Sequence, residues 1–298
     1  MTTGDGQVPK FYTKRKTSQN HHELYRPMSH SSGMFCWEET AHFILLRIMR
    51  RVKQVKGIKM ISNSTHIVSG YDTELSTLTN DLTDLGTLVS EMVEDAMQAF
   101  RKRDSVKAQQ VIERDEQANA LQFKVDEAVQ RIIALRNPVA QDLRRIIGAT
   151  RIASDLERVG DLAEGIARRA MAINEEKRID IAKSVYRMGK QVRKQLAGAL
   201  DTLLKGDAIA ALHYWQADSD IDDLYDAIFR ELVTVMMGDP RTIPACTELL
   251  FVAKNLERIG DHATNICEAV YFTIKATQLI SDPALKDLRR EYEGSELR

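Results

Sequence analysis

Apolar residues recur at steps of three and four positions along most of this chain, a pattern typical of helices with one buried face. The clearest stripe lies in residues 75–100 and predicts a helix of about thirty residues. A break at 103–105 offers an N-cap for a second helix, which ends before Pro138 because proline disfavours helix in the preceding residue. A third helix is predicted from about Val139 to Ile173. The first stripe consists of Leu75, Leu78, Leu82, Leu85, Val89, Met92, Ala96 and Phe100.

The second half of the chain repeats this plan. No alternation typical of strands occurs anywhere in the sequence. The pattern therefore predicts an all-α protein made of two tandem three-helix bundles of long antiparallel helices. The expected second set is a fourth helix over 185–203, a break at 205–207, a fifth helix ending near Met237, and a sixth from about Ile243 past Tyr271.

A hexamer that occurs twice supports a duplication. Leu156–Asp161 returns one hundred residues later as Leu256–Asp261, with a single Val-to-Ile difference. Earlier in the two units the spacing is 103 residues, as between Gly86 and Gly189. Similarity at a long, nearly fixed spacing indicates a duplicated structural unit. The expected domains are a first repeat at 60–174, a second repeat at 175–280 and a polar C-terminal tail at 281–298.

Residues 1–59 differ chemically from the rest of the chain. They hold eleven Lys and Arg against four Asp and Glu, whereas residues 60–298 hold 31 against 39. Residues 1 to about 35 are polar without periodicity and predict disorder. Residues 38–57 have the pattern of one short basic amphipathic helix, a kind that binds anionic membrane surfaces. Alternatively, Met60 is the true start and residues 1–59 are an over-extended leader.

Composition excludes several classes of protein. An acidic body argues against nucleic acid as the main ligand, since binding phosphates needs clustered cations. The longest apolar run, Phe43–Met49, is too short to span a membrane and too far from the start to be a secretory signal. Three cysteines without a C-x-x-C pair indicate a reducing compartment. We expect a soluble, cytoplasmic protein.

Each copy of the hexamer presents a Glu-x-x-x-Asp pair. Residues four apart lie on one helix face, so Glu157 and Asp161 point the same way, as do Glu257 and Asp261. Like charges this close raise each other's pKa unless a cation neutralises them, and all-oxygen ligation suits Mg²⁺, Mn²⁺, Ca²⁺ or iron. The middle helices add candidate ligands: Asp115, Asn119 and Asp126 in the first repeat, and Asp218, Asp222 and Asp226 in the second.

A glycine precedes each of the two aspartates. Glycine inside a helix costs about 1 kcal/mol relative to alanine, so Gly160 and Gly260 predict that room is needed beside the carboxylates. The alternative is that these are ordinary solvated helix faces. The acids of the first helix are expected at the surface, because the fourth helix carries Arg193 and Lys194 instead of matching acids. These acids are Glu91, Glu94 and Asp95; His262 is likewise expected at the surface, and Cys246 and Cys267 in the apolar interior.

Familiar catalytic motifs are absent from the sequence. It contains no Gly-rich phosphate loop, no Gly-x-Ser-x-Gly and no His-Glu-x-x-His. A di-iron enzyme in a four-helix bundle needs Glu-x-x-His from two helices. The chain has one such pair, Glu39 and His42, inside the leader. We therefore expect that this protein is not an enzyme.

The two hexamers resemble the paired Glu-x-x-x-Asp signatures of the PhoU proteins, bacterial regulators of phosphate uptake. The resemblance extends from about Tyr71 to Lys275 and does not include residues 1–59. It includes the segments 131–134, 142–144, 236–244 and 265–268.

The resemblance implies two three-helix bundles side by side in a cytoplasmic homodimer. It also implies divalent or trivalent metal ions, with iron, Mn, Mg and Zn as candidates. The implied partners are the ATPase subunit of the phosphate ABC transporter and a phosphate sensor histidine kinase, with membrane contact only peripherally through them. One departure is that Asn265 follows the second signature where Gly165 follows the first. By match, Glu157, Asp161, Glu257 and Asp261 face a metal or a partner, with support from Asp115, Asn119, Asp218 and Asp222, and Arg158 and Arg258 face a partner.

Three functional hypotheses follow. The first is a non-enzymatic adaptor that holds the phosphate-starvation response off, as a negative regulator, when phosphate is plentiful. The second is a metal-binding enzyme or metal store that uses the carboxylates. The third is a helical scaffold without a ligand, in which the four signature acids have no function.

Overall fold

A computed structural model describes residues 69–176, 179–216 and 219–279, all of which belong to one compact unit, Arg47–Arg298. The expectations for residues 1–59 and for the tail at 281–298 lie outside the described residues. Everything described is helix or short connection, which confirms the all-α prediction. The elements are α2 (Ser69–Lys102), α3 (Ser105–Arg136), α4 (Ala140–Asn174), α5 (Ala182–Lys205), α6 (Ala208–Gln216), α7 (Ser219–Gly238), the 3₁₀ turn η1 (Pro240–Thr242) and α8 (Ile243–Lys275).

The helix boundaries follow the predicted breaks closely. Asp104 caps α3, where its carboxylate accepts a hydrogen bond from Lys107 N at 2.9 Å. Its counterpart in the second repeat, Asp207, accepts from Ile209 N and Ala210 N, both at 3.0 Å. Gly206, immediately before it, has φ of 63°, a backbone region that favours glycine. One element differs from expectation: the predicted fifth helix is described as α6 and α7, which lie on either side of residues 217–218.

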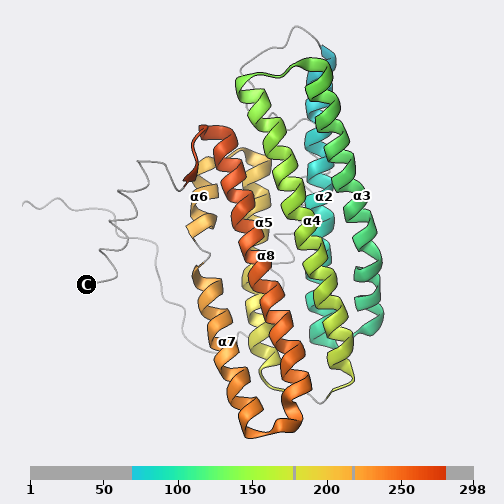
Figure 1. Cartoon of the computed structure of the whole chain (residues 1–298), viewed down its shortest axis with the longest axis vertical. Coiled ribbons are helices and arrows are strands. Elements are labelled where there is room, and N and C mark those ends of the chain that lie inside the picture. Colours follow the sequence, from blue (N-terminus) through green and yellow to red (C-terminus); the bar gives the residue numbers. More distant parts are fainter. Residues whose placement is uncertain (1–68, 177–178, 217–218, 280–298) are drawn as a thin grey trace, which may run out of the picture. The chain divides into compact units, whose positions relative to one another are not determined.

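The two repeats share one hydrophobic core. In Figure 1, α3 lies on one flank, α6 and α7 lie on the other, and α2, α4, α5 and α8 lie between them. One continuous cluster of buried apolar side chains includes residues from both repeats. Cys246 and Cys267 are fully buried within it, as predicted. The repeats are therefore halves of a single packed body.

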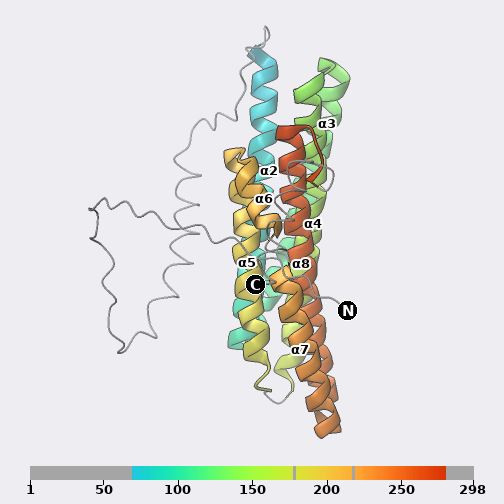
Figure 2. The ribbon, with the colours of Figure 1, turned by 90° about the vertical axis from the view of Figure 1, so that its left-hand side faces the viewer.

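The inner helices pack antiparallel, and their contacts are symmetric. Asn265 Nδ2 on α8 donates to Asp155 Oδ1 on α4 at 3.3 Å. Asn255, the counterpart of Asp155, donates from Nδ2 to the carbonyl of Leu162 at 3.5 Å, three residues before Gly165, the counterpart of Asn265. In each contact a residue before one signature meets the segment after the other signature. An approximate two-fold axis therefore relates the two repeats. The views in Figures 1 and 2 show this antiparallel course of α4 and α8.

The glycine after the first signature is explained by this crossing. A Cβ atom at Gly165 would lie 2.7 Å from Asn255 Nδ2, a distance that requires a shift of the amide. The equivalent Asn265 instead faces Asp155, where its amide finds an acceptor. The difference between Gly165 and Asn265 therefore results from the packing of α4 against α8.

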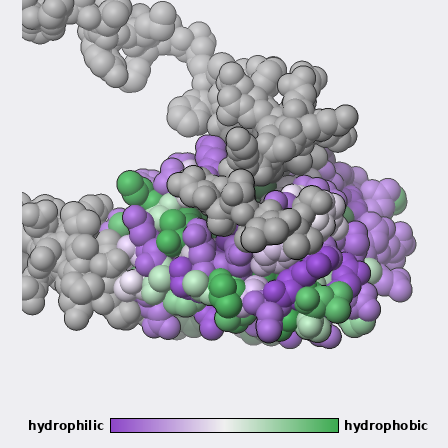
Figure 3. Space-filling model, turned by 90° about the horizontal axis from the view of Figure 1, so that it is seen from above, coloured by the Kyte–Doolittle hydropathy of each residue, from purple (hydrophilic) through white to green (hydrophobic). Residues whose placement is uncertain are grey.

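The described surface of the protein is mostly polar (Figure 3). Viewed from above in Figure 3, hydrophilic residues dominate the described surface and hydrophobic residues are scattered among them. Of the helices in the described ranges, none is both long and apolar enough to cross a membrane.

Candidate functional site

The first signature lies on the face of α4 that meets α3. Glu157 and Asp161 lie one turn apart, and Asp115 approaches them from α3: its Oδ1 lies 3.7 Å from where a Cβ of Gly160 would stand. Glu164, three residues after Asp161, adds a fourth acid whose charge acts on Asp115. The predicted group of Glu157, Asp161 and Asp115 is therefore brought together, with Glu164 as a member that sequence reasoning missed.

Hydrogen bonding leaves this acidic group partly uncompensated. Asp115 Oδ2 accepts from Asn119 Nδ2 at 3.2 Å, but its Oδ1 is buried and accepts no hydrogen bond from the described residues. Arg158 donates from Nη1 to Asp161 Oδ2 at 2.9 Å and lies 3.5 Å from Glu157 Oε2. The exposed Arg158 thus serves two carboxylates and Arg168 pairs with Glu164 at 2.5 Å, but neither donates to the buried Oδ1 of Asp115.

The electrostatics follow from this geometry. Burial, followed by the negative charges of Asp161 and Glu164, raises the pKa of Asp115. Burial and then the charge of Asp161 likewise raise the pKa of Glu157. An acid whose pKa is raised by folding contributes stability at low pH and loses it as pH rises through the folded-state pKa. At neutral pH the first signature therefore costs stability, and a bound cation would remove that cost.

The second signature is electrostatically different. Lys254 on α8 donates from Nζ to Glu257 Oε1 at 2.7 Å, and this hydrogen bond raises the pKa of Lys254. The equivalent of Lys254 in the first repeat is Ser154, and the equivalent of Glu164 is Thr264. At these two positions the second copy has one acid fewer and one cation more, although Glu164 of the first copy is itself paired with Arg168 at 2.5 Å.

The other predicted ligands of the second repeat lie at the surface or outside the described residues. Asp261 and Asp222 are exposed, and Asp218 lies outside the described residues. Arg258 is exposed, as is its counterpart Arg158. Within residues 69–176, 179–216 and 219–279, no three His, Cys, Asp or Glu side chains are already arranged to hold a metal ion.

Two of the three acids expected at the surface, Glu94 and Asp95, lie instead in contacts between helices. Glu94 is half-buried and forms an ion pair with Arg193 of α5. Asp95 binds Lys107 and Arg114, both at 2.6 Å; burial opposes ionisation there, yet these hydrogen bonds lower the pKa of Asp95. These acids join helices, and so they do not belong to the open surface.

His262 was also expected at the surface, and it too lies in a contact between helices. Its Nδ1 lies 2.9 Å from Asp155 Oδ1, and its side chain is mostly buried between α4 and α8. Both signature glycines were expected to leave space that a side chain would fill, but only Gly260 is tightly surrounded. A Cβ at Gly160 would make ordinary contacts at 3.5 Å or more, whereas one at Gly260 would lie 3.3 Å from both Gln195 and Ile221.

A sequence signal for the missed residues does exist. The hexamers match, but the residues on either side of them do not: Ser154 and Glu164 in the first repeat correspond to Lys254 and Thr264 in the second. A comparison of residues one hundred positions apart therefore predicts that the two copies of the signature differ in charge.

Comparison with known proteins agrees with this architecture. The PhoU domain family model matches residues 82–170 and 185–270. A phosphate-specific transport system accessory protein PhoU homolog from Caulobacter vibrioides is 45% identical over 217 residues, which are 72% of this chain and 94% of the relative. The corresponding Rhizobium meliloti homolog is 41% identical over 214 residues, covering 72% and 90%.

Solved structures show the same relationship. The crystal structure of PhoU from Pseudomonas aeruginosa superposes with a TM-score of 0.68 at 41% identity, covering 70% of this chain and all of that one. The phosphate transport system regulatory protein PhoU from Streptococcus pneumoniae gives 0.66 at 31% identity, covering 70% and 99%. The resemblance read from the hexamers is confirmed, and the chain belongs to the PhoU family.

Proposed function

We propose that this protein is a regulatory component of phosphate transport that acts by binding partners and not by catalysis. The relatives at 41–45% identity are named as accessory proteins of the phosphate-specific transport system. The observation that carries the proposal is the duplicated signature on α4 and α8, beside which these two helices contact each other through Asn255 and Asn265. Its partners would be the ATPase subunit of the phosphate transporter and a phosphate sensor histidine kinase, engaged in the cytoplasm by a homodimer.

The mechanism proposed is a shift in the state of the kinase. An adaptor changes the equilibrium of its partner only by the difference between its affinities for the two states of that partner. The exposed Arg158 and Arg258 lie within the two signatures and would present cations to such a partner. Binding would repress the phosphate-starvation response when phosphate is plentiful.

A reporter assay tests this function. In phosphate-rich medium, deletion of the gene should raise the activity of a phosphate-starvation promoter, and the wild-type chain should restore low activity. The double variant Glu157→Gln with Glu257→Gln should leave the promoter active, because it removes the signature charges on both repeats. A matched double variant at exposed acids of α3 and α7, Glu116→Gln with Glu231→Gln, should repress normally at equal protein level. Low activity in the deletion strain itself would refute the proposal.

We also propose that the first signature binds a hard divalent cation. Its donors fit such an ion: they are carboxylate oxygens, one of them is buried without a hydrogen bond, and two have a raised pKa. When bound, the cation would supply positive charge to Asp115, Glu157, Asp161 and Glu164. Arg158 would have to release Asp161 for the ion to bind. The charge pattern favours the first repeat, since Lys254 already supplies a cation to Glu257.

Metal-dependent stability tests this site. Mn²⁺ at about one hundred times its Kd should stabilise the wild-type chain by about 2.7 kcal/mol, measured as a rise in melting temperature. Asp115→Asn should abolish most of this rise, whereas the exposed neighbour variant Glu116→Gln should retain it. Equal stabilisation of wild type and Asp115→Asn, by Mn²⁺ or by Mg²⁺, would place the metal elsewhere. Turnover of a phosphoester by the loaded protein would instead favour the metal-enzyme hypothesis.

A further inference from the structure

The helix α5 carries a surface whose charge differs from that of the rest of the body. Four of its cations are exposed and follow one another at steps of four, three and four positions, so they lie on one face of the helix over about 16 Å. They form what we call the basic stripe: Lys183, Arg187, Lys190 and Lys194. Residues 182–200 contain no acid, although residues 60–298 as a whole hold eight more Asp and Glu than Lys and Arg.

The end of α2 adds cations beside the basic stripe. Arg101 Nη1 donates to the hydroxyl of Tyr186 on α5 at 3.1 Å, and the Arg101 guanidinium lies 5.1 Å from the centre of that ring. Lys190 Nζ lies 5.2 Å from the same centre. Cations from both helices therefore gather around Tyr186, and the exposed Lys102 follows Arg101. Figure 2 shows these two helices side by side.

The basic stripe is unfavourable for α5 itself. Like charges three or four positions apart on a helix repel each other, and cations in the first turns of a helix oppose its dipole. Asp180 offsets this for Lys183, with which it pairs at 3.0 Å.

Packing does not require the basic stripe either. The two repeats share one core, yet the equivalent positions of α2, 103 residues earlier, hold no cation. A row of exposed like charges that destabilises its own helix and is absent from the other repeat points to a role outside the fold. The equivalent residues are Asn80, Asp84, Thr87 and Glu91.

The polar character of this face indicates the kind of partner. Among the described residues of α2 and α5, none is a large apolar side chain at an exposed position. A basic helix that binds a membrane surface also inserts apolar side chains into it. The net negative charge of residues 60–298 opposes nucleic acid. Acidic protein surfaces remain, and charge complementarity of this kind steers association and selects partners.

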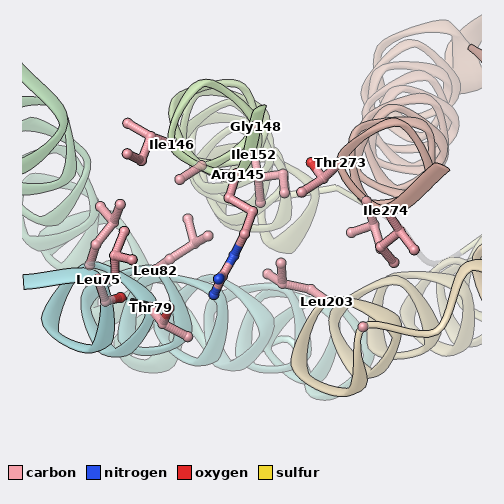
Figure 4. Close-up of a pocket in the computed structure, with 14 residues that line it drawn as sticks. Leu75, Thr79, Leu82, Arg145, Ile146, Gly148, Ile152, Leu203, Thr273 and Ile274 are labelled. Atoms are coloured by element: carbon pink, nitrogen blue, oxygen red, sulfur yellow. Dashed lines mark hydrogen bonds between the residues drawn. The ribbon is translucent and has the colours of Figure 1, made fainter. Parts of the chain in front are cut away.

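At its opposite end, α5 stops beside a small hollow between α2, α4 and α8. Figure 4 shows aliphatic side chains around this hollow, among them Leu82, Ile152 and Leu203. Its volume is about 60 Å³, whereas ligand pockets usually enclose about 300 Å³ or more. The hollow is therefore too small for a ligand, and the basic stripe is the part of α5 that is open to a partner.

We propose that the basic stripe binds an acidic surface of a partner protein, on which carboxylates follow one face of a helix at the same spacing. Arg101 and Lys102 extend the contact onto α2. This inference rests on the partner-binding function proposed above and specifies the chemistry of one partner. It concerns a surface outside both signatures.

Two synthetic peptides test the contact with the full chain. The first is an alanine-rich helix with four glutamates at steps of four, three and four positions, and the second has the same composition with the glutamates spread around the helix. Fluorescence anisotropy at low salt should show that the first peptide binds about tenfold more tightly than the second. Added salt should weaken this binding, because the charges are exposed.

A pair of double variants locates the binding surface. Lys190→Gln with Lys194→Gln should weaken binding of the first peptide about tenfold, because two of the ion pairs are lost. The matched control Arg131→Gln with Arg151→Gln removes the same charge from exposed positions of α3 and α4 and should bind like the wild type. Equal losses in the two double variants would reduce the effect to net charge and overturn the proposal. Binding of duplex DNA or phosphatidylglycerol vesicles by a wild-type chain that does not bind the peptide would overturn it as well.

The reporter assay separates this inference from the regulatory function. Where deletion of the gene raises promoter activity, the chain with Lys190→Gln and Lys194→Gln should fail to restore low activity at equal protein level, whereas the control variant should restore it. Full repression by the stripe variant would overturn the inference and leave the regulatory function intact. If deletion itself has no effect, the regulatory function is refuted, and peptide binding alone then decides the inference.

Discussion

Replacing Leu156 with alanine is expected to lower the free energy of unfolding by about 4 kcal/mol. Leu156 is fully buried, and its Cδ1 lies 3.7 Å from the Cβ position of Gly86, close to Leu200. It therefore fills the junction of α2, α4 and α5, where helices of both repeats meet and cannot easily close over a cavity. Urea unfolding followed by circular dichroism measures the change.

The control for this substitution is a leucine of the same size at the surface. Leu135 on α3 is 67% exposed, so Leu135→Ala should change the unfolding free energy by less than about 0.5 kcal/mol. Equal effects of the two substitutions would show that the junction is not packed as described. Unfolding in two separated steps would show that the repeats do not share one core.

Local sequence signals predicted the helices well. The period of three and four positions defined the buried stripe of α2, in which Leu85, Val89 and Met92 are completely buried. The aspartates at the predicted breaks do cap α3 and α6 through backbone hydrogen bonds. Such signals act within a few residues of the chain, so they can be read without knowledge of the neighbours.

Contacts between helices could not be read in the same way. Periodicity shows which face of a helix is apolar, but not which helix covers that face. Glu94 and His262 therefore looked like surface residues, although partners on other helices, Arg193 and Asp155, hold them in interfaces. The close packing of α6 on α5 was also hidden, with Tyr214 lying against Gly198.

The sequence predicted which carboxylates share a helix face, but it did not predict the difference in charge between the two copies. The Glu-x-x-x-Asp pairs share a helix face as the spacing required, and Asp115 joins the first pair. The difference between the copies arises from Lys254, which neutralises Glu257 within its own helix. A duplicated motif therefore need not provide two equal sites, because the residues beside it set the local charge.

Replacing Arg193 with methionine is expected to lower the free energy of unfolding by about 3 kcal/mol. Arg193 of α5 pairs with Glu94 of α2 and is only 13% exposed. Burial lowers the pKa of Arg193 to about 10, so the guanidinium remains charged at neutral pH. Its removal leaves the mostly buried Glu94 carboxylate with only the amide of Gln98, at 2.7 Å, as a described donor. Breaking one side of a buried pair is costly for this reason.

The double variant separates this explanation from simple loss of packing. Arg193→Met together with Glu94→Gln removes both charges, so it should recover most of the lost stability, since an apolar or neutral replacement of a whole buried pair is often tolerated. Glu94→Gln alone should also destabilise the protein, because it leaves the arginine buried without its anion. The coupling energy from urea unfolding of the four proteins measures the interaction directly. Strictly additive effects would mean that the pair does not join the two repeats, whereas a large coupling would make it an electrostatic link between α2 and α5.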